Sequence, residues 1–211
     1  MRLLLGSASP RRAQLLRQLG ADFEQRSADI DESVLPGEHP EDYVARLARE
    51  KSQALMSADT VLLTADTTVA IDELIMGKPE NPADARRILK LLSGVTHRVY
   101  TGLCVAATVD GECRTHAAVV TTEVDFIVLP DTLIDDYLAT DEPWDKAGAY
   151  AIQRLGGSFV RRIRGSVSNV IGLPLVETRE LLEHAGLPMT VGKASDGDTD
   201  KAYGPKATVK M

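Results

Sequence analysis

Cysteine is scarce in this chain of 211 residues, which has only two. Two cysteines cannot build the disulfide framework on which small secreted domains depend. They flank a turn expected at residues 110–111, where a two-residue hairpin would set Cys113 opposite Thr108 and Cys104 opposite Ala117. The two thiols are then not cross-strand partners, and we predict that both are reduced core residues.

Histidine is also sparse. The four histidines, His39, His97, His116 and His184, show no spacing that is typical of a zinc site. A metal, if the protein uses one, is therefore expected to be bound by oxygen atoms, which suit a hard divalent ion.

Long apolar runs and an excess of positive charge are missing too. No stretch approaches the ~18–20 apolar residues of a membrane span. The apolar start at residues 1–6 ends too early for a secretory signal. We therefore expect a cytoplasmic protein that does not bind membranes. Lys+Arg total 24 against 31 for Asp+Glu, a net charge of −7, and the pI is near 5.1, which argues against a nucleic-acid partner.

The remaining composition, 44% apolar and 26% charged, is that of an ordinary globular protein with a core. Strand and helix patterns alternate along the chain, and the hairpin around residues 110–111 must be antiparallel. The predicted class is therefore α/β with a mixed sheet. We expect strands at 2–6, 22–27 and 60–65, a strand pair around 71–76, two long strands from 96 to 128 on either side of residues 110–111, and one or two strands at 159–171. Helices are expected at 9–20, 40–56, 82–93, 130–139 and 174–185.

The end of the chain differs from the rest in composition. Residues 188–211 contain few apolar side chains, so they are predicted to be a polar, mobile tail without an assigned function. Residues 1–187 are predicted to form the folded domain.

A lysine interrupts the apolar stripe of the second predicted helix. Val44, Leu47 and Ala48 lie on this stripe, and helical spacing places Lys51 on it as well. The simple explanation is that the lysine stem reaches out to water. The alternative is a buried functional cation.

The first strand meets its helix in a cluster of hydroxyls and cations, at Ser7, Ser9, Arg11 and Arg12. A helix N-terminus binds phosphate readily, whereas cations placed there oppose the helix dipole by roughly 0.3–1 kcal/mol each. A bound anion would remove that penalty. Alternatively, Ser9 only caps the helix and the arginines are solvated. The spacing is not that of a Walker loop.

Asp66 follows the buried strand 60–65, and ligands of open α/β sheets bind outside the carboxyl ends of strands. If the first strand is parallel to it, Ser7 and Asp66 face one cleft. Alternatively, Asp66 caps a turn with Thr67 and Thr68. Glu32 and Lys78 are weaker candidates by themselves. Together these residues offer phosphate-binding hydroxyls and arginines, two further cations and two carboxylates, which are the groups that phosphoryl chemistry with Mg²⁺ or Mn²⁺ requires.

Seven segments in this order resemble the Maf proteins, nucleoside triphosphate pyrophosphatases related in fold to the inosine triphosphate pyrophosphatases. They are SASPRR (7–12), LAREK (47–51), ADT (65–67), GKP (77–79), LSGVTH (92–97), DKAGAYAIQ (145–153) and GLPL (172–175). The resemblance implies a twisted mixed sheet, flanked by helices, with a deep cleft. It also implies cleavage of a nucleotide between its α- and β-phosphates with a divalent cation, Mg²⁺ or Mn²⁺.

The resemblance also suggests residue roles. Asp66 resembles the proton acceptor that activates water, and Glu32 resembles a metal-holding carboxylate. Whether Asp66 mainly takes the proton or mainly holds the metal stays open. Lys51 and Lys78 resemble the lysines that neutralise phosphate charge.

Substrate choice is the remaining role that the resemblance assigns, to Arg11, Thr67 and Gln153. The segment 148–153 is similar to the subgroup that acts on dTTP and UTP, and an amide such as that of Gln153 can pair with both a donor and an acceptor of a pyrimidine. The next residue, Arg154, stands where members of this family commonly have a small residue. Its side chain would alter the base preference if it entered the cleft. The alternatives are hydrolysis of 7-methyl-GTP and a nucleotide-binding regulator of cell division and septum formation. A homodimer is a further implication.

Overall fold

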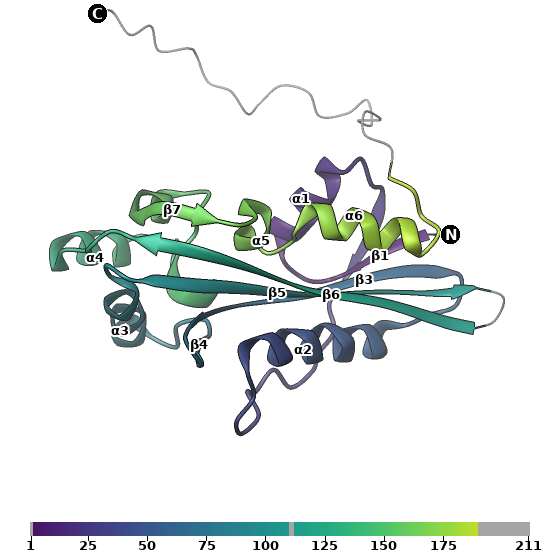
Figure 1. Cartoon of the computed structure of the whole chain (residues 1–211), viewed down its shortest axis with the longest axis horizontal. Helices are drawn as coiled ribbons and strands as arrows, with labels where there is room; N and C mark the ends of the chain where they lie inside the picture. Colours follow the sequence, from purple (N-terminus) through teal and green to yellow (C-terminus); the bar gives the residue numbers. More distant parts are fainter. Residues whose placement is uncertain (1, 110–111, 190–211) are drawn as a thin grey trace, which may run out of the picture.

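One mixed sheet organises the part of the chain that the computed structural model describes, residues 2–109 and 112–189 (Figure 1). Its path is β2-β1-β3-β5-β6-β7, and β4 pairs with β3 as well. β2 and β3 run parallel to β1, and the other pairs are antiparallel. The strands are β1 (Arg2–Gly6), β2 (Phe23–Arg26), β3 (Thr60–Ile71), β4 (Leu74–Met76), β5 (Thr96–Val109), β6 (Glu112–Phe126) and β7 (Val160–Arg164).

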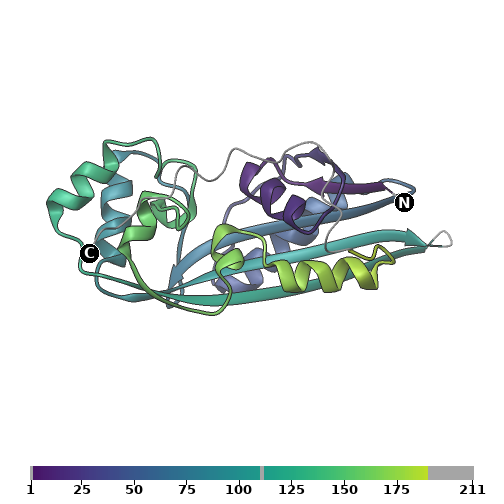
Figure 2. The same ribbon diagram turned by 90° about the horizontal axis from the view of Figure 1, so that it is seen from above.

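Helices cover both faces of this sheet (Figure 2). α2 (Pro40–Leu55) lies on one face, and α1 (Pro10–Gln18), α5 (Val167–Ile171) and α6 (Leu175–His184) lie on the other. α3 (Pro82–Leu92) and α4 (Asp131–Leu138) gather at the far end of the long hairpin, and two 3₁₀ turns, η1 (Ala147–Ala149) and η2 (Leu155–Phe159), follow them. α1, α2 and α3 each begin at a proline, which suits the first helical turn because its N–H is missing.

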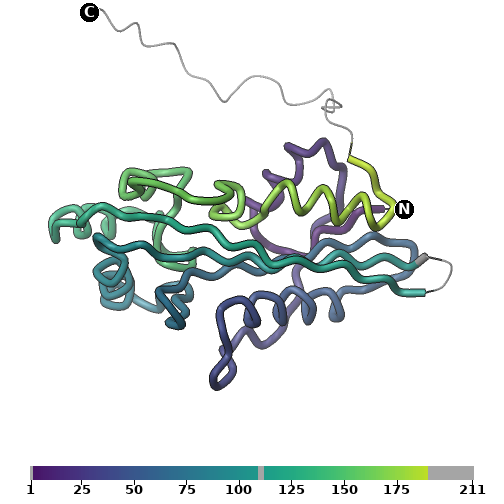
Figure 3. Tube along the Cα trace, in the orientation of Figure 1, coloured from purple at the N-terminus to yellow at the C-terminus, as the bar shows by residue number. Residues whose placement is uncertain are grey.

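The long strands β5 and β6 run side by side along the sheet (Figure 3), and β5 contributes side chains to two hydrophobic clusters. One cluster packs α1 and α6 on the sheet and includes Leu5, Leu16 and Leu63. The other lies under α3 and α4 and includes Ile88 and Phe126. These two larger clusters meet β3 on either side of residue 66, since Ala65 belongs to the first and Val69 to the second.

Side chains of β3 alternate between the two faces. Leu63 belongs to the cluster under α1, whereas the Thr64 hydroxyl donates to the Ala48 carbonyl of α2 at 2.6 Å. Strand alternation therefore turns Asp66 toward α2 and Thr67 toward α1.

Gly102 allows α2 to approach the sheet closely. It pairs with Asp66 across β5 and β3, and a Cβ atom at this position would lie 2.2 Å from the Val44 carbonyl oxygen. Only glycine leaves that space free, so a single residue sets the distance between α2 and the strand that carries Asp66.

The mixed α/β class agrees with the sequence prediction, and so does the order of the strands and helices except for α5, which was not predicted. The cysteine registers are confirmed as well, with Cys113 opposite Thr108 and Cys104 opposite Ala117. Both thiols are free. Cys113, however, is exposed, so the prediction of a core residue was wrong there. Its end of the hairpin projects beyond the covering helices (Figure 1).

Two predicted boundaries were also wrong. β3 does not end at residue 65 but continues to Ile71, because β5 pairs with it as far as Ala70. Residues 159–171 form β7 followed by the short helix α5, not one or two strands. The Ser166 side chain caps this helix by accepting a hydrogen bond from the Asn169 amide at 3.2 Å. This cap outweighs the preference of the β-branched residues in the segment for a strand.

In the described residues, no helix is long and apolar enough to cross a membrane. Residues 190–211 lie outside the described residues, so the mobile tail stays a prediction.

Candidate active site

The site forms where one edge of β3 has no neighbouring strand. On the side away from β5, β1 pairs with residues 60–64 and β4 pairs with residues 69–71. Within the described chain, residues 65–68 have no strand partner on that side. Asp66 and Thr67 lie in this gap. Asp66 is therefore in the middle of a strand, neither at its carboxyl end nor in a turn as the sequence suggested.

Two chain segments enter the gap from opposite ends. β1 is parallel to β3 and ends at Gly6, so Ser7 follows it into the gap. β4 is antiparallel and ends at Met76, so Lys78 enters from the other direction. A cleft of about 310 Å³ opens here, lined by Ser7, Ser9, Arg11, Arg12, Glu32, Lys51, Asp66, Lys78 and Asp145 among others.

The Arg12 guanidinium connects three segments beside the gap. Nε donates to the Gly172 carbonyl at 2.8 Å, Nη1 to the Ser7 hydroxyl at 3.0 Å and Nη2 to the Thr67 hydroxyl at 3.0 Å. Burial lowers the pKa of Arg12, and the nearby charge of Asp66 opposes that shift. Three of its five N–H donors are therefore used within the protein, and two remain for an anion.

Ser7 and Ser9 shape the start of α1. The Ser9 hydroxyl accepts from the Arg12 amide at 3.4 Å, which confirms it as the helix cap. The Ser7 hydroxyl oxygen accepts from the Ser9 amide at 3.2 Å as well as from Arg12. Its own proton has no acceptor among the described residues, so it can be donated to a ligand.

Lys51 is buried and does not reach out to water. Its Nζ is 2.6 Å from Asp66 Oδ1 and 2.6 Å from Glu32 Oε1, and the residue is 8% exposed. Burial alone would raise the pKa of Glu32, but the hydrogen bond and charge of Lys51, with Lys78 and Arg12, hold it below its usual value. The lysine that interrupts the apolar stripe of α2 is thus a buried cation shared by two carboxylates. Gly102 contributes to this arrangement, because its missing side chain lets α2 lie close to the sheet.

Two residues of α2 hold the loop that carries Glu32. Arg46 binds the Glu38 carboxylate through Nε at 2.6 Å and Nη2 at 2.8 Å, and it donates to the Ser33 carbonyl at 3.0 Å. The hydrogen bond to Arg46 lowers the pKa of Glu38. The Tyr43 hydroxyl donates to the Glu32 carbonyl at 2.9 Å. The loop is therefore fixed at Glu32, the residue that reaches Lys51, and at the residues that follow it.

Arg11 lies at the opposite wall of the cleft. Its Nη1 is 2.8 Å from Asp145 Oδ2, and Lys146 binds the same carboxylate. Burial works against the ionised form, but the hydrogen bonds and charges of Lys146 and Arg11 lower the pKa of Asp145 to about 2. The Asp145 carboxylate is therefore ionised at neutral pH.

A second, smaller recess of about 50 Å³ adjoins the cleft and shares Arg11 with it. It is lined also by Thr67, Tyr150 and Gln153. The three residues to which the resemblance assigns substrate choice therefore meet in one recess beside the charged cleft. Arg154 lines neither space, because its Nε turns toward Glu142 Oε2 at 3.6 Å.

The family described as Maf-like protein matches residues 2–185. The chain belongs to the Maf family. A dTTP/UTP pyrophosphatase of Anaeromyxobacter dehalogenans (strain 2CP-C) is 54% identical over 188 residues, which cover 89% of this chain and 96% of that protein. Two proteins of the same name show 50% identity in Pseudoalteromonas atlantica and 48% in Shewanella oneidensis, over 88% and 89% of this chain and 97% and 100% of theirs.

A divalent cation fits the donors of this Maf site. Glu32 and Asp66 face one cleft and each uses one carboxylate oxygen on Lys51, so the second oxygen of each could bind a metal. Across residues 2–109 and 112–189, no group of three or more His, Cys, Asp or Glu could hold an ion by itself. Mg²⁺ is often bound by one or two carboxylates, while phosphates of the substrate and water supply its other ligands. Glu32 and Asp66 would provide the two carboxylates here.

All ten predicted site residues line the Maf cleft or the recess beside it. The prediction missed Asp145 as a partner of Arg11, and it missed Arg46 and Tyr43 behind Glu32. No local pattern marks these three, because each contact joins segments that only the fold brings together.

Proposed function

We propose that the chain hydrolyses nucleoside triphosphates, dTTP and UTP above others, to the monophosphate and pyrophosphate. The observation that carries the proposal is the charged cleft at the open edge of β3, where four cationic and three carboxylate side chains converge. The names of relatives at about 50% identity support the substrate.

The triphosphate would lie along the cations. Arg11 and Arg12, at the N-terminus of α1, and Lys78, from the other side, neutralise phosphate oxygens, and the Ser7 hydroxyl donates to one of them. Lys51 is held by its two carboxylates and contributes a further positive charge to the cleft, which it lines. Such fixed cations stabilise the charge that develops on the leaving pyrophosphate.

Hydrolysis needs one water molecule and one proton acceptor. The water oxygen forms a bond to the α-phosphorus while the bond to the oxygen that bridges to the β-phosphate breaks, and pyrophosphate leaves. Asp66 is placed to accept the proton of that water, since its carboxylate lines the cleft. Glu32, with Asp66, would hold a divalent cation, Mg²⁺ or Mn²⁺, which supplies further neutralisation of the phosphates.

The base would enter the recess beside the cleft. Gln153 offers an acceptor and a donor, a combination that matches the O4 and N3–H of thymine and uracil. Thr67 lines the same recess and holds a hydrogen bond to Thr101 at 2.9 Å.

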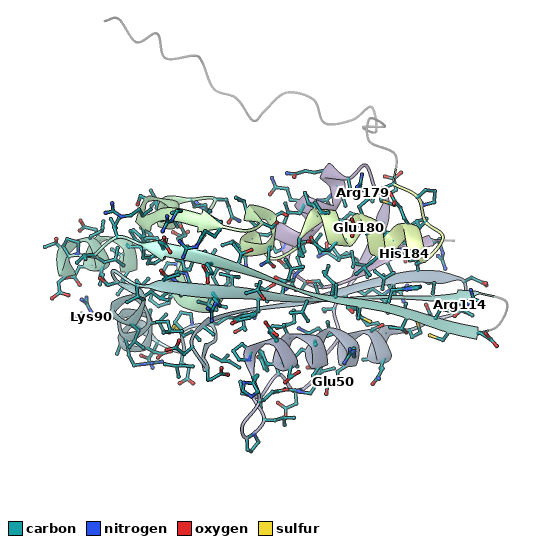
Figure 4. All side chains as sticks on the ribbon, in the orientation of Figure 1. Glu50, Lys90, Arg114, Arg179, Glu180 and His184 are labelled. Atoms are coloured by element: carbon teal, nitrogen blue, oxygen red, sulfur yellow. The ribbon has the colours of Figure 1, made fainter. Side chains whose placement is uncertain are left out.

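The test is pyrophosphate release from dTTP, UTP, CTP, GTP and 7-methyl-GTP at several Mg²⁺ concentrations. We expect Asp66→Asn to lower kcat by about 100-fold or more at saturating Mg²⁺. Glu32→Gln should instead raise the Mg²⁺ concentration needed for half-maximal rate. Glu180→Gln changes an exposed carboxylate of α6, away from the cleft, and serves as the matched control (Figure 4).

Other outcomes have distinct meanings. Preference for 7-methyl-GTP would keep the chemistry and refute the base assignment. Absence of pyrophosphate release from every nucleotide would refute the activity and favour a nucleotide-binding regulator of cell division. In that case, overexpressed Asp66→Asn should still disturb septum formation.

We also propose a homodimer that acts in the cytoplasm. The free thiols of Cys104 and Cys113 suit a reducing compartment. Light scattering tests the oligomeric state, and a monomer at micromolar concentration would refute the dimer.

A further inference from the structure

A buried carboxylate outside the cleft has no role in the chemistry proposed above. Glu142 is 5% exposed and follows α4 in the segment that leads to the recess. Glutamate is rarely buried unless it is paired or fully hydrogen-bonded, because removal of its charge from water is costly. The partners of this carboxylate therefore indicate what it holds in place.

The Glu142 carboxylate accepts three hydrogen bonds. Oε1 accepts from the Tyr137 hydroxyl at 3.0 Å and from the Gly156 amide at 2.9 Å, and Oε2 accepts from the Leu155 amide at 3.0 Å. Burial, together with Glu142, raises the pKa of Tyr137, so its hydroxyl stays protonated and donates. The Tyr137 oxygen in turn accepts from the Ala151 amide at 3.3 Å.

These contacts hold both ends of a short stretch of chain. Tyr137 binds the backbone at Ala151, and Glu142 binds it at Leu155 and Gly156. Gln153 lies between these anchored positions. Gly156 completes the arrangement, since a Cβ atom there would lie 2.9 Å from both the Tyr137 hydroxyl and the Ala151 amide nitrogen.

Gln153 needs such external support. It is exposed at the mouth of the recess, and no hydrogen bond fixes its side chain within the described part of the chain. An amide distinguishes bases only if its donor and acceptor point in the correct directions. The backbone that carries it must therefore be rigid before the nucleotide binds.

We propose that Tyr137 and Glu142 are positioning residues that orient Gln153 and thereby set the base selectivity of the enzyme. The inference rests on the proposed function for the identity of the base. Neither residue lines the cleft or the recess, so both act through the backbone at 151–156.

The central test is a double-mutant cycle with Tyr137→Phe and Gln153→Ala. Selectivity is measured as the ratio of kcat/KM for dTTP to kcat/KM for CTP. We expect Tyr137→Phe to lower this ratio by about tenfold, the scale of one well-oriented hydrogen bond, mainly through the KM for dTTP. In the Gln153→Ala background, the same change should leave the ratio unaltered.

Two controls separate positioning from general destabilisation. Leu181→Ala weakens the core under α6, far from the segment, and should lower Tm without any change in selectivity. Arg154→Ala removes the exposed side chain that faces Glu142 at 3.6 Å and leaves every backbone contact intact, so the ratio should also stay constant. Glu142→Gln, which sets an amide N–H₂ against a backbone N–H, should act in the same direction as Tyr137→Phe.

Failure of this inference differs from failure of the proposed function. Equal losses for dTTP and CTP in Tyr137→Phe, or losses that add to those of Gln153→Ala, would overturn the positioning role while hydrolysis persists. Equilibrium binding of dTMP and CMP to the same variants measures base selectivity without hydrolysis. It therefore decides the positioning role even if no nucleotide is cleaved.

Discussion

At the residue scale, burial determines the state of His97, which belongs to one of the segments that resemble Maf proteins. The residue is 1% exposed, and its Nε2 is 2.9 Å from the hydroxyl of Tyr150, a residue of the recess wall. Burial lowers its pKa to about 4, although the charge of Asp125 opposes the shift. The ring is therefore neutral at neutral pH and packs edge-on against Phe126.

We predict that His97→Gln flattens the dependence of stability on pH. The pKa is near 6.5 in the unfolded chain and about 4 in the folded one, so the unfolded state binds more protons between these values. The wild type should lose up to about 1.4 kcal/mol of unfolding free energy per pH unit through this residue as the pH falls from 6.5 to 4. Urea unfolding at pH 7 and pH 4.5 measures the difference.

Glutamine does not titrate in this range, so the variant lacks that loss even if it is less stable at pH 7. Parallel curves for wild type and variant would show that His97 binds its proton equally in both states.

At the scale of elements, the site depends on where two short strands end. β1 and β4 both stop beside β3, and the four residues left between them include Asp66 and Thr67. α2 contributes Lys51 to one face of this gap, while α1 contributes Arg12 to the other. The cleft therefore wraps around an open strand edge, and it reaches both faces of the sheet.

Gly102→Ala should separate α2 from the sheet. The added methyl would lie 2.2 Å from the Val44 carbonyl oxygen, so the helix must move and the contact between Lys51 and Asp66 must lengthen. We expect a loss of about 3 kcal/mol or more of unfolding free energy, the upper end of the range for overpacking, together with lower activity. Thermal unfolding and pyrophosphate release measure both effects.

Gly77→Ala provides the comparison for stability. A Cβ atom at Gly77 has nothing within 4 Å, so Tm should be unchanged or slightly higher. Equal Tm values for the two variants would contradict the close approach of α2 at Gly102.

At the scale of the whole molecule, the cleft lies between two hydrophobic cores on one sheet. The Maf family match covers residues 2–185, and the predicted site residues lie between Ser7 and Gln153. All of the predicted site residues are therefore contained in the matched region.

A chain that ends at Met189 should keep both its stability and its activity. The reason is that the family match and all predicted site residues precede that position. Differential scanning calorimetry and pyrophosphate release compare it with the full chain. A Tm lower by more than about 4 °C, which corresponds to roughly 1 kcal/mol, would show that residues 190–211 contribute to the fold.

Local signals in the sequence were reliable where the physics is local. Ser9 followed by Pro10 marked a helix start, and helical spacing showed that Lys51 interrupts an apolar stripe. Local reasoning failed at Asp66, where three polar residues after an apolar run suggested that the strand had ended. The pairing with β5, a contact between distant segments, carries the strand through that position.

The sequence by itself determined the α/β class, the starts of α1, α2, α3, α4 and α6, the cysteine registers and most of the charged residues of the site, because periodicity and capping act over a few residues. Only the tertiary structure decided that Lys51 is buried between two carboxylates, that Arg46 fixes the Glu32 loop and that Glu142 anchors the segment of Gln153. These contacts join residues that are distant in sequence. Their existence depends on how closely helices, strands and loops pack, and Gly102 shows that a single missing side chain can set that distance.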